Sequence, residues 1–165
     1  MPRALFDPSV SISLLDRLTD REPNVKHEPP ASRAQTVRQL RAALRRDLEW
    51  LFNARRTPTE PPEDARELRR SVFWYGLPDI TGVSVDSDVE REMVARAMEA
   101  AIETFEPRLA QISVTVQDLR GPARVLRFRI EAMLLIEPAP ERISFDTALH
   151  LTSSQYEVEG QKNAG

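Results

Sequence analysis

The chain lacks several residue types on which common sites depend. It contains no cysteine, which excludes disulfide bonds and zinc sites built on thiolates. Its five glycines are scattered, so no glycine-rich phosphate loop is present. Its two histidines, His27 and His150, have no second ligand at metal-binding spacing. These absences predict a protein that holds no metal and no cofactor.

Long apolar runs are also missing. No stretch approaches the roughly 20 apolar residues that a membrane-spanning helix needs. The first residues, Met1 to Pro8, lack the apolar core of a signal peptide. We therefore expect a cytoplasmic protein without membrane insertion.

Groups able to perform catalysis are hard to find. Glu99, Glu103 and Glu106 recur at helical spacing and imitate the carboxylate pair of a glycoside hydrolase, but that chemistry needs one acid in an apolar pocket. A solvated helix face accounts for these acids more simply. Ser153 and Ser154 have no His or Asp partner pattern nearby. We expect no catalytic residue and no enzymatic activity.

Charge is distributed unevenly along a chain with a net charge of -3. Residues 31–60 hold seven arginines against three acids. An arginine face over residues 33–56, with Trp50 and Phe52 close by, is one way to bind nucleic acid. Asp47 and Glu49 interrupt that run, however. A solvated or protein-contacting helix face is the preferred interpretation, and nucleic-acid binding is the alternative.

The N-terminal part, residues 1–31, is expected to lie outside the main domain. Residues 11–19 can form a short helix with leucines on one side, and residues 20–31 contain three prolines and resemble a flexible linker. Such a helix can dock on a neighbouring protein or on its own domain, and the sequence leaves both possibilities open.

Three further helices are expected. One starts at a capping-box pattern of Ser32 and Gln35 and a second runs from Pro62 to Gly76. The third starts at Ser87 and ends before Pro107. Their apolar stripes are Val37, Leu40, Leu44, Leu48 and Leu51; Ala65, Leu68, Val72 and Tyr75; and Val89, Met93, Val94, Ala97, Met98, Ala100, Ala101, Ile102 and Phe105. Phe73 and Tyr75 are expected in the core, which leaves Trp74 for an interface.

After residue 108 the apolar period changes from helical to two. The alternating residues are Ile112, Val114 and Val116; Leu126, Phe128, Ile130, Ala132, Leu134 and Ile136; and Ile143, Phe145, Thr147, Leu149 and Leu151. Together these patterns predict an α+β fold in which a three-stranded antiparallel meander packs its dry face against two to three helices. The domain is expected to span residues 32–155, followed by a polar tail at residues 156–165.

The junction of the third helix and the first strand reads Phe105-Glu106-Pro107-Arg108-Leu109. Proline disfavours helical conformation in the residue before it, so Glu106 and Arg108 are expected on a rigid elbow. A fixed carboxylate and a planar guanidinium suit ion pairing with a partner protein. The two side chains can also pair with each other, and the sequence does not exclude this.

Four segments in order resemble one family. They are residues 13–18, Ser-Leu-Leu-Asp-Arg-Leu; residues 51–55, Leu-Phe-Asn-Ala-Arg; residues 75–79, Tyr-Gly-Leu-Pro-Asp; and the elbow. In this order they resemble the TssE family of type VI secretion baseplate wedge proteins, which is similar to the small wedge protein of contractile phage tails. The family most often has Asn-Thr-Arg where this chain has Asn53-Ala54-Arg55, a departure that affects one hydroxyl.

The resemblance implies a structural component that joins the wedge core bundle to the contractile sheath and helps to start sheath polymerisation. The implied partners are TssF- and TssG-like wedge proteins, TssB/TssC-like sheath proteins and other baseplate components, assembled at the cytoplasmic face of the inner membrane. By motif match the wedge contact would be Glu106, Pro107 and Arg108. The alternative is a small adaptor that uses the elbow outside a secretion machine.

Further interface residues are expected beside the elbow. Asn53, Arg55 and Trp74 are possible contacts. The strand taken as the last one, residues 143–151, would lie near the sheath, and its alternating residues are Ile143, Phe145, Thr147, Leu149 and Leu151. An exposed strand at a sheet edge is a template for a strand of another chain.

Overall fold

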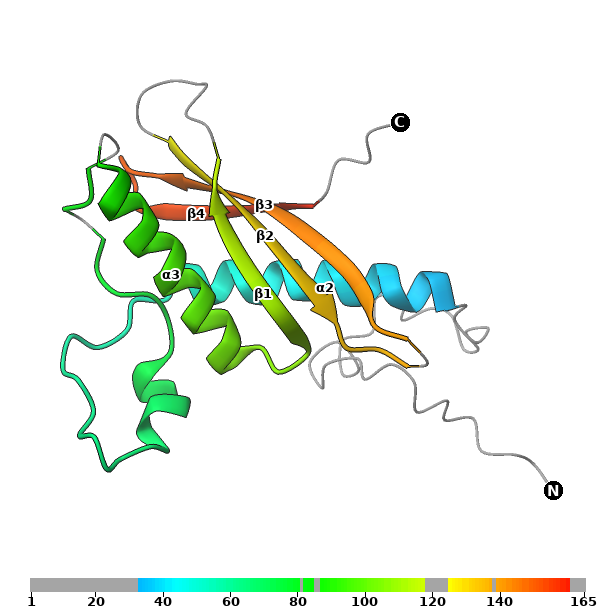
Figure 1. The fold of residues 1–165 in the computed structure, drawn as a ribbon, viewed down its shortest axis with the longest axis horizontal. Helices are drawn as coiled ribbons and strands as arrows, with labels where there is room; N and C mark the ends of the chain where they lie inside the picture. The colour runs from blue at the N-terminus through cyan, green and yellow to red at the C-terminus, as the bar shows by residue number, and fades with distance from the viewer. Residues whose placement is uncertain (1–32, 81, 85–86, 118–124, 138, 161–165) are drawn as a thin grey trace, which may run out of the picture.

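The computed structural model describes residues 33–80, 82–84, 87–117, 125–137 and 139–160 (Figure 1). The elements in chain order are α2 (Arg33–Asn53), the short 3-10 helices η1 (Leu68–Arg70) and η2 (Val72–Trp74), α3 (Asp88–Phe105), β1 (Leu109–Val116), β2 (Val125–Leu134), β3 (Glu141–His150) and β4 (Gln155–Gly160). The helix expected at residues 11–19 and the linker after it lie outside the described residues.

The four strands form one antiparallel sheet in the order β1-β2-β3-β4 (Figure 1). The α+β class and the meander are confirmed, but the expected number of three strands is wrong. The expectation of a polar tail from residue 156 is also wrong, because residues 155–160 form β4. Tyr156 and Val158 are buried there and alternate with acidic residues, a pattern too short to stand out in the sequence.

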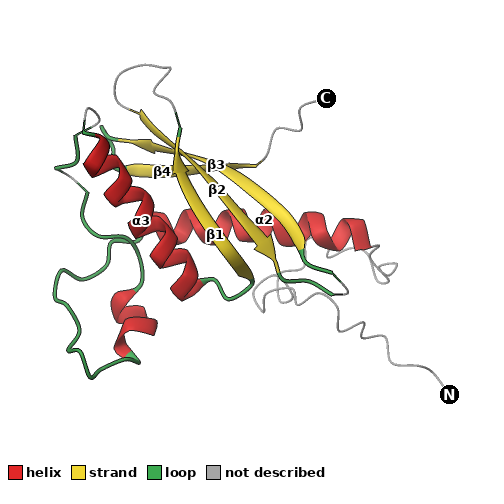
Figure 2. Cartoon of the chain, viewed as in Figure 1, coloured by secondary structure: helices red, strands yellow, loops and turns green. Residues whose placement is uncertain are grey.

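One face of the sheet is buried and apolar. The buried strand residues that alternate toward it are Leu126, Phe128, Ile130, Ala132 and Leu134 on β2, Ile143, Phe145, Thr147 and Leu149 on β3, and Tyr156 and Val158 on β4. Helix α3 packs mainly against β1, and α2 packs mainly against β4 (Figure 2). Both helices contribute to the same hydrophobic cluster, so the molecule has a helical layer on one side of a sheet.

Helix α2 follows its predicted stripe. Leu40, Leu44, Leu48 and Leu51 are all at most 2% exposed. These leucines recur three or four residues apart and therefore share one face of the helix. The long stripe holds α2 across the sheet and brings the residues near its C-terminal end to the elbow.

Helix α3 begins at the predicted cap. The Ser87 hydroxyl accepts a hydrogen bond from the Glu90 N–H at 3.3 Å. The Glu90 carboxylate accepts from the Ser84 N–H at 2.5 Å, so the acid holds the loop before the helix. Two residues of the predicted apolar face, Val89 and Met93, are 72% and 62% exposed. The apolar face is therefore narrower than the sequence indicates.

The α-helix expected between Pro62 and Gly76 is absent. In its place lie η1 and η2, separated by Ser71, whose backbone is extended at φ -95° and ψ 173°. The Ser71 hydroxyl accepts from the Phe73 N–H and starts the second turn. Val72 is 90% and Phe73 is 43% exposed, so the expectation that they are buried is wrong.

A main-chain link ties the end of α2 to the segment before α3. The Leu77 N–H donates to the Ala54 carbonyl at 2.9 Å, and the Arg56 N–H donates to the Leu77 carbonyl at 3.0 Å. Gly76 makes this approach possible: its φ is +107°, and a Cβ there would lie 2.1 Å from the Ala54 carbonyl oxygen. The link places Tyr75 beside the C-terminal half of α2.

Candidate functional site

The elbow is a tight turn at the end of α3. The Glu106 N–H makes the last helical hydrogen bond, to the Ile102 carbonyl at 2.8 Å, and Glu106 itself leaves the helical region with φ -121° and ψ 77°. The Leu109 N–H then donates to the Glu106 carbonyl at 3.1 Å. Pro107 therefore occupies the second position of a four-residue turn, where its fixed φ is favoured.

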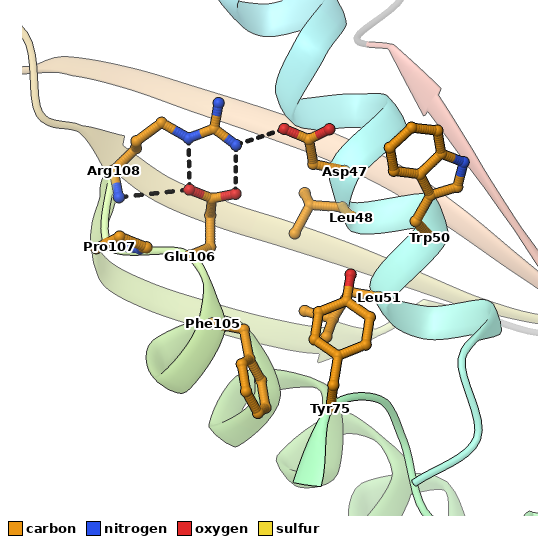
Figure 3. Close-up of a pocket in the computed structure, with 9 residues that line it drawn as sticks. All are labelled: Asp47, Leu48, Trp50, Leu51, Tyr75, Phe105, Glu106, Pro107 and Arg108. Carbon is orange, nitrogen blue, oxygen red and sulfur yellow. Dashed lines mark hydrogen bonds and ion pairs between the residues drawn. The ribbon is translucent and has the colours of Figure 1, made fainter. Parts of the chain in front are cut away.

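Arg108 connects the two carboxylates of the site (Figure 3). Its Nε lies 2.5 Å from Glu106 Oε1, and its Nη2 lies 2.5 Å from Glu106 Oε2. The same Nη2 lies 2.6 Å from Asp47 Oδ2 on α2. The alternative that Glu106 and Arg108 pair with each other is thus realised, and a third residue from another element joins them.

The network is largely screened from solvent. The side chain of Glu106 is 8% exposed, and those of Arg108 and Asp47 are both 22% exposed. Burial alone would lower the pKa of Arg108, but its hydrogen bonds and charge interactions with Glu106 and Asp47 raise the pKa above its ordinary value. The guanidinium is therefore held in its charged form and in one orientation.

A cavity of about 370 Å³ lies beside this network. Its walls come from α2, from Tyr75 and from the elbow, and the nine residues that line it are Asp47, Leu48, Trp50, Leu51, Tyr75, Phe105, Glu106, Pro107 and Arg108 (Figure 3). Apolar side chains form most of these walls, and the ion network forms one side. A cavity with mostly apolar walls next to fixed charges is suited to a protein side chain that has both an apolar part and a polar or charged group.

Tyr75 forms a part of the cavity wall that contacts the first residue of the elbow, Phe105. Its ring meets the Phe105 ring edge-on, with centroids 5.2 Å apart. Burial raises the pKa of Tyr75 above its ordinary value, and the negative charges of Asp47 and Glu106 raise it further. Tyr75 is half-buried, which partly meets the expectation that it packs in the core.

Trp50 stands at the mouth of the cavity. It is 54% exposed, and the guanidinium of Arg46 lies 5.0 Å from its ring centroid. Arg46 also donates to Asp47 Oδ1 from Nη2 at 2.9 Å. The site thus extends from Arg108 through Asp47 and Arg46 to an exposed indole, the type of side chain that often anchors protein interfaces.

Trp74 and Arg55 are two further residues that the sequence predicts as contacts with a partner. Trp74 is half-buried, and the guanidinium of Arg56 lies 4.3 Å from its ring centroid. The side chain of Arg55 is 64% exposed and lies 3.7 Å from Asp79. Neither Trp74 nor Arg55 lines the cavity, and their roles in an interface stay predictions.

Asn53 has a role that the sequence did not indicate. Its side-chain amide donates to the Tyr156 carbonyl at 2.8 Å and accepts from the Tyr156 N–H at 2.9 Å. It also donates to the Glu49 carbonyl at 2.8 Å. The last residue of α2 therefore pairs with the main chain of β4, as a neighbouring strand would.

The strand expected near a sheath is not the last one. Residues 141–150 form β3, which pairs with β2 on one side and β4 on the other. Ile143, Phe145, Thr147 and Leu149 are at most 4% exposed, and Leu151 lies just beyond the strand. The edge strands of this sheet are β1 and β4, so β3 has no open edge for another chain.

Asp47 is the site residue that sequence reasoning missed. In the sequence it stands out only as an interruption of an arginine-rich run. The signal in the sequence is that Asp47 is an acid beside the end of a buried leucine stripe. A carboxylate in such a place needs a cation as its partner. Its partner is 61 residues away in the chain, and only the packing of α2 against the elbow identifies that partner.

The sequence was also compared with known protein families. Residues 38–139 match the family described as baseplate wedge protein gp25. The chain belongs to this family. The prediction of a TssE-like baseplate wedge protein is thereby confirmed, and the chain is a structural component of a baseplate.

The chain is also similar to part of a solved structure. The structure is a chain of "The baseplate complex from the type VI secretion system", with 15% sequence identity and a TM-score of 0.48. The alignment covers 75% of this chain and 97% of that chain. No curated protein matches. No helix of the described residues is long and apolar enough to span a membrane.

Proposed function

We propose that this protein joins the wedge core bundle of a type VI secretion baseplate to the contractile sheath and helps to start sheath polymerisation. The single observation that carries the wedge contact is the Glu106–Arg108–Asp47 network, which fixes the elbow beside a partly apolar cavity. The membership of this chain in the baseplate wedge family supports the baseplate role. It acts as a structural protein at the cytoplasmic face of the inner membrane and has no enzymatic activity.

The groups of the elbow divide into a supporting and a contacting set. Glu106 accepts hydrogen bonds from Arg108 and is almost fully buried, so it supports the turn. Pro107 is exposed, and Trp50 is exposed at the other side of the cavity. We therefore propose that TssF- and TssG-like proteins contact Pro107, the exposed part of the Arg108 side chain and Trp50. A side chain of the partner would enter the cavity.

The sheath attachment is proposed to use an edge of the sheet. An edge strand carries unpaired main-chain groups that can accept a strand from another protein. With β3 enclosed between β2 and β4, this role passes from residues 143–151 to β1 or β4. The partners would be TssB/TssC-like sheath proteins.

Co-expression with the candidate wedge and sheath proteins, followed by size-exclusion chromatography, tests the proposal. We expect the chain to co-elute with the TssF- and TssG-like proteins. Pro107→Glu adds a carboxylate to the exposed side of the turn without removing any residue of the network, and this added charge at the contact should abolish co-elution. Pro107→Ala keeps the surface neutral and should preserve it.

Two further variants separate contact from folding. Trp50→Ala removes an exposed indole at the cavity and should weaken the complex. The control Met93→Ala removes a similarly exposed side chain of α3 that does not line the cavity. Equal co-elution of all four variants would exclude the elbow as the contact. A chain that elutes alone in every combination would favour an adaptor outside a secretion machine.

A further inference from the structure

The lining of the elbow cavity carries more negative than positive charge. Three of its nine residues are charged, namely the carboxylates of Asp47 and Glu106 and the guanidinium of Arg108. Two negative charges and one positive charge leave one negative charge in excess. Arg46 also pairs with Asp47, but it does not line the cavity and its side chain is partly exposed to water, which screens its charge.

Arg108 has no free donor for an anion in the cavity. Its Nε donates to Glu106 Oε1, and its Nη2 donates to Glu106 Oε2 and to Asp47 Oδ2. The remaining nitrogen, Nη1, is buried away from solvent and has no partner among the described residues. An acidic side chain that entered the cavity would therefore find no donor on Arg108 and would lie close to two carboxylates.

The two carboxylates can each accept a further hydrogen bond. An ionised carboxylate has about four acceptor positions. Asp47 accepts two hydrogen bonds from Arg46 at Oδ1 and one from Arg108 at Oδ2. Glu106 accepts three, all from Arg108. Within the described part of the chain, each carboxylate thus keeps one acceptor position for a donor that enters the cavity.

The hydroxyl of Tyr75 lies in the field of these carboxylates. In Figure 3 it points from the wall of the cavity toward α2. Burial raises the pKa of Tyr75, and the negative charges of Asp47 and Glu106 raise it further. Charges that oppose a phenolate at this place favour a cation there. The hydroxyl oxygen is also able to accept a hydrogen bond from that cation.

The remaining walls fit the flat and the apolar parts of an arginine side chain. The rings of Trp50 and Tyr75 border the cavity, and Leu48 and Leu51 form its wall on α2. A guanidinium stacks on aromatic faces, and the methylene groups of arginine pack on apolar surface. The guanidinium of Arg46, 5.0 Å from the Trp50 ring centroid, already makes such a contact at the mouth. Lysine fits less well, because its ammonium group is more strongly hydrated and does not stack.

We infer that the cavity binds the side chain of an arginine from the partner protein. The guanidinium lies between the carboxylates of Asp47 and Glu106 and the hydroxyl of Tyr75, and the methylene groups pack on Leu48 and Leu51. This inference rests on the proposed function and deepens it, because it names the side chain with which the wedge partner enters the cavity.

Titration with a single capped amino acid tests the inference without any baseplate protein. The probe is N-acetyl-arginine methylamide, added to the full chain, and the measurement is the NMR shift of the Trp50 indole N–H and of the Tyr75 ring. We expect both signals to saturate with a dissociation constant on the order of 1 mM, as for a ligand of this size. Trp74 is the internal control, because it does not line the cavity and its indole signal should stay unchanged.

Three matched probes separate charge from apolar packing. N-acetyl-norleucine methylamide has a similar apolar chain without a charge, and it should bind about tenfold more weakly. The corresponding lysine compound should bind about threefold more weakly than the arginine compound, because its ammonium group cannot stack. The corresponding glutamate compound should cause no shift, since the lining has an excess negative charge and no free donor on Arg108.

A pair of variants on α2 tests the role of the charge. Asp47→Asn removes the excess negative charge and keeps the size of the side chain, so the preference for arginine over norleucine should fall to about twofold. Glu49→Gln is the matched control, because it removes a carboxylate of α2 that does not line the cavity, and it should preserve the preference. Circular dichroism checks that both variants fold.

Tyr75→Phe provides a test that leaves the ion network in place. The ring remains and only the hydroxyl is lost, so binding of the arginine compound should weaken about threefold while binding of the norleucine compound stays the same. This variant decides the question if Asp47→Asn does not fold.

Three results would overturn the inference. They are equal binding of the arginine and norleucine compounds, saturable binding of the glutamate compound, and no shift of Trp50 and Tyr75 at about 100 mM of the arginine compound. In each case co-elution with the wedge proteins can persist through another side chain. Loss of co-elution together with intact arginine selectivity would instead refute the proposed function, so the two failures can be told apart.

Discussion

Arg108 and Asp47 lie 61 residues apart in the chain, and Arg108 Nη2 lies 2.6 Å from Asp47 Oδ2. This ion pair links the elbow after α3 to the C-terminal half of α2. Because Arg108 binds Glu106 at the same time, the contact fixes both the conformation of the turn and its position against the helix. The shape of the cavity depends on it.

Loss of the guanidinium should destabilise the fold. Arg108→Met leaves Glu106 and Asp47 close together without their common cation, and we expect a loss of about 3 kcal/mol in the free energy of unfolding, measured by urea denaturation. Arg127→Met, on an exposed position of β2, should change it little. In the double variant with Asp47→Asn the cost should be less than the sum, and strict additivity would contradict the network.

The hydroxyl of Tyr156 is unpaired within the described part of the chain. Its oxygen is buried and has no hydrogen-bond partner within the described residues, while its ring packs against Phe52 with centroids 5.7 Å apart. Tyr156→Phe keeps the ring and removes the unsatisfied group, so we expect unchanged stability or a gain of about 1 kcal/mol. A clear loss in thermal denaturation would indicate a partner for the hydroxyl.

Alkaline pH should destabilise the protein through its two tyrosines. Burial raises the pKa of Tyr156, and burial and nearby carboxylates raise the pKa of Tyr75. Both folded-state pKa values exceed the unfolded value of about 10, so the stabilising effect is complete below that pH. Above it the unfolded state loses protons first, and stability falls as pH rises.

The ultraviolet absorbance of tyrosinate, followed together with circular dichroism, measures this dependence. We expect tyrosine ionisation to coincide with unfolding in the wild type. In Tyr156→Phe the loss of stability above about pH 10 should be smaller, since one raised group is gone. Two tyrosines that titrate near their ordinary pKa in the intact fold would refute the prediction.

Gly76 should not tolerate a side chain. Its φ of +107° opposes substitution, and so does the Ala54 carbonyl oxygen, which lies 2.1 Å from the position that a Cβ would take. Gly76→Ala should therefore cost about 3 kcal/mol or more in unfolding free energy and loosen the cavity wall at Tyr75. Gly82→Ala is the control, because a Cβ there meets nothing within 4 Å. Equal stability of the two variants would contradict this account.

The regular elements were predictable where periodicity was long. The leucine stripe of α2 and the alternation on β2 each extend over enough residues to separate a period of 3.6 from a period of two. The strand β4 was not predictable in this way because only Tyr156 and Val158 mark it as buried. The helix predicted around Val72 is wrong because four apolar residues at helical spacing also fit a chain that Ser71 interrupts.

The sequence predicts where the candidate site lies in the chain, but it does not predict which side chains contact one another there. The sequence by itself determined the turn at Pro107 and the presence of Glu106 and Arg108 on it, because proline restricts its own backbone and that of its neighbour. It also determined the family, through local motifs in a constant order. Only the tertiary structure decided that Glu106 is buried with Arg108, that Asp47 completes the network, and that Asn53 pairs with the main chain of Tyr156 on β4. The contacts of Asp47 and Asn53 join segments 61 and 103 residues apart, and no local pattern encodes which distant side chain will pack beside another.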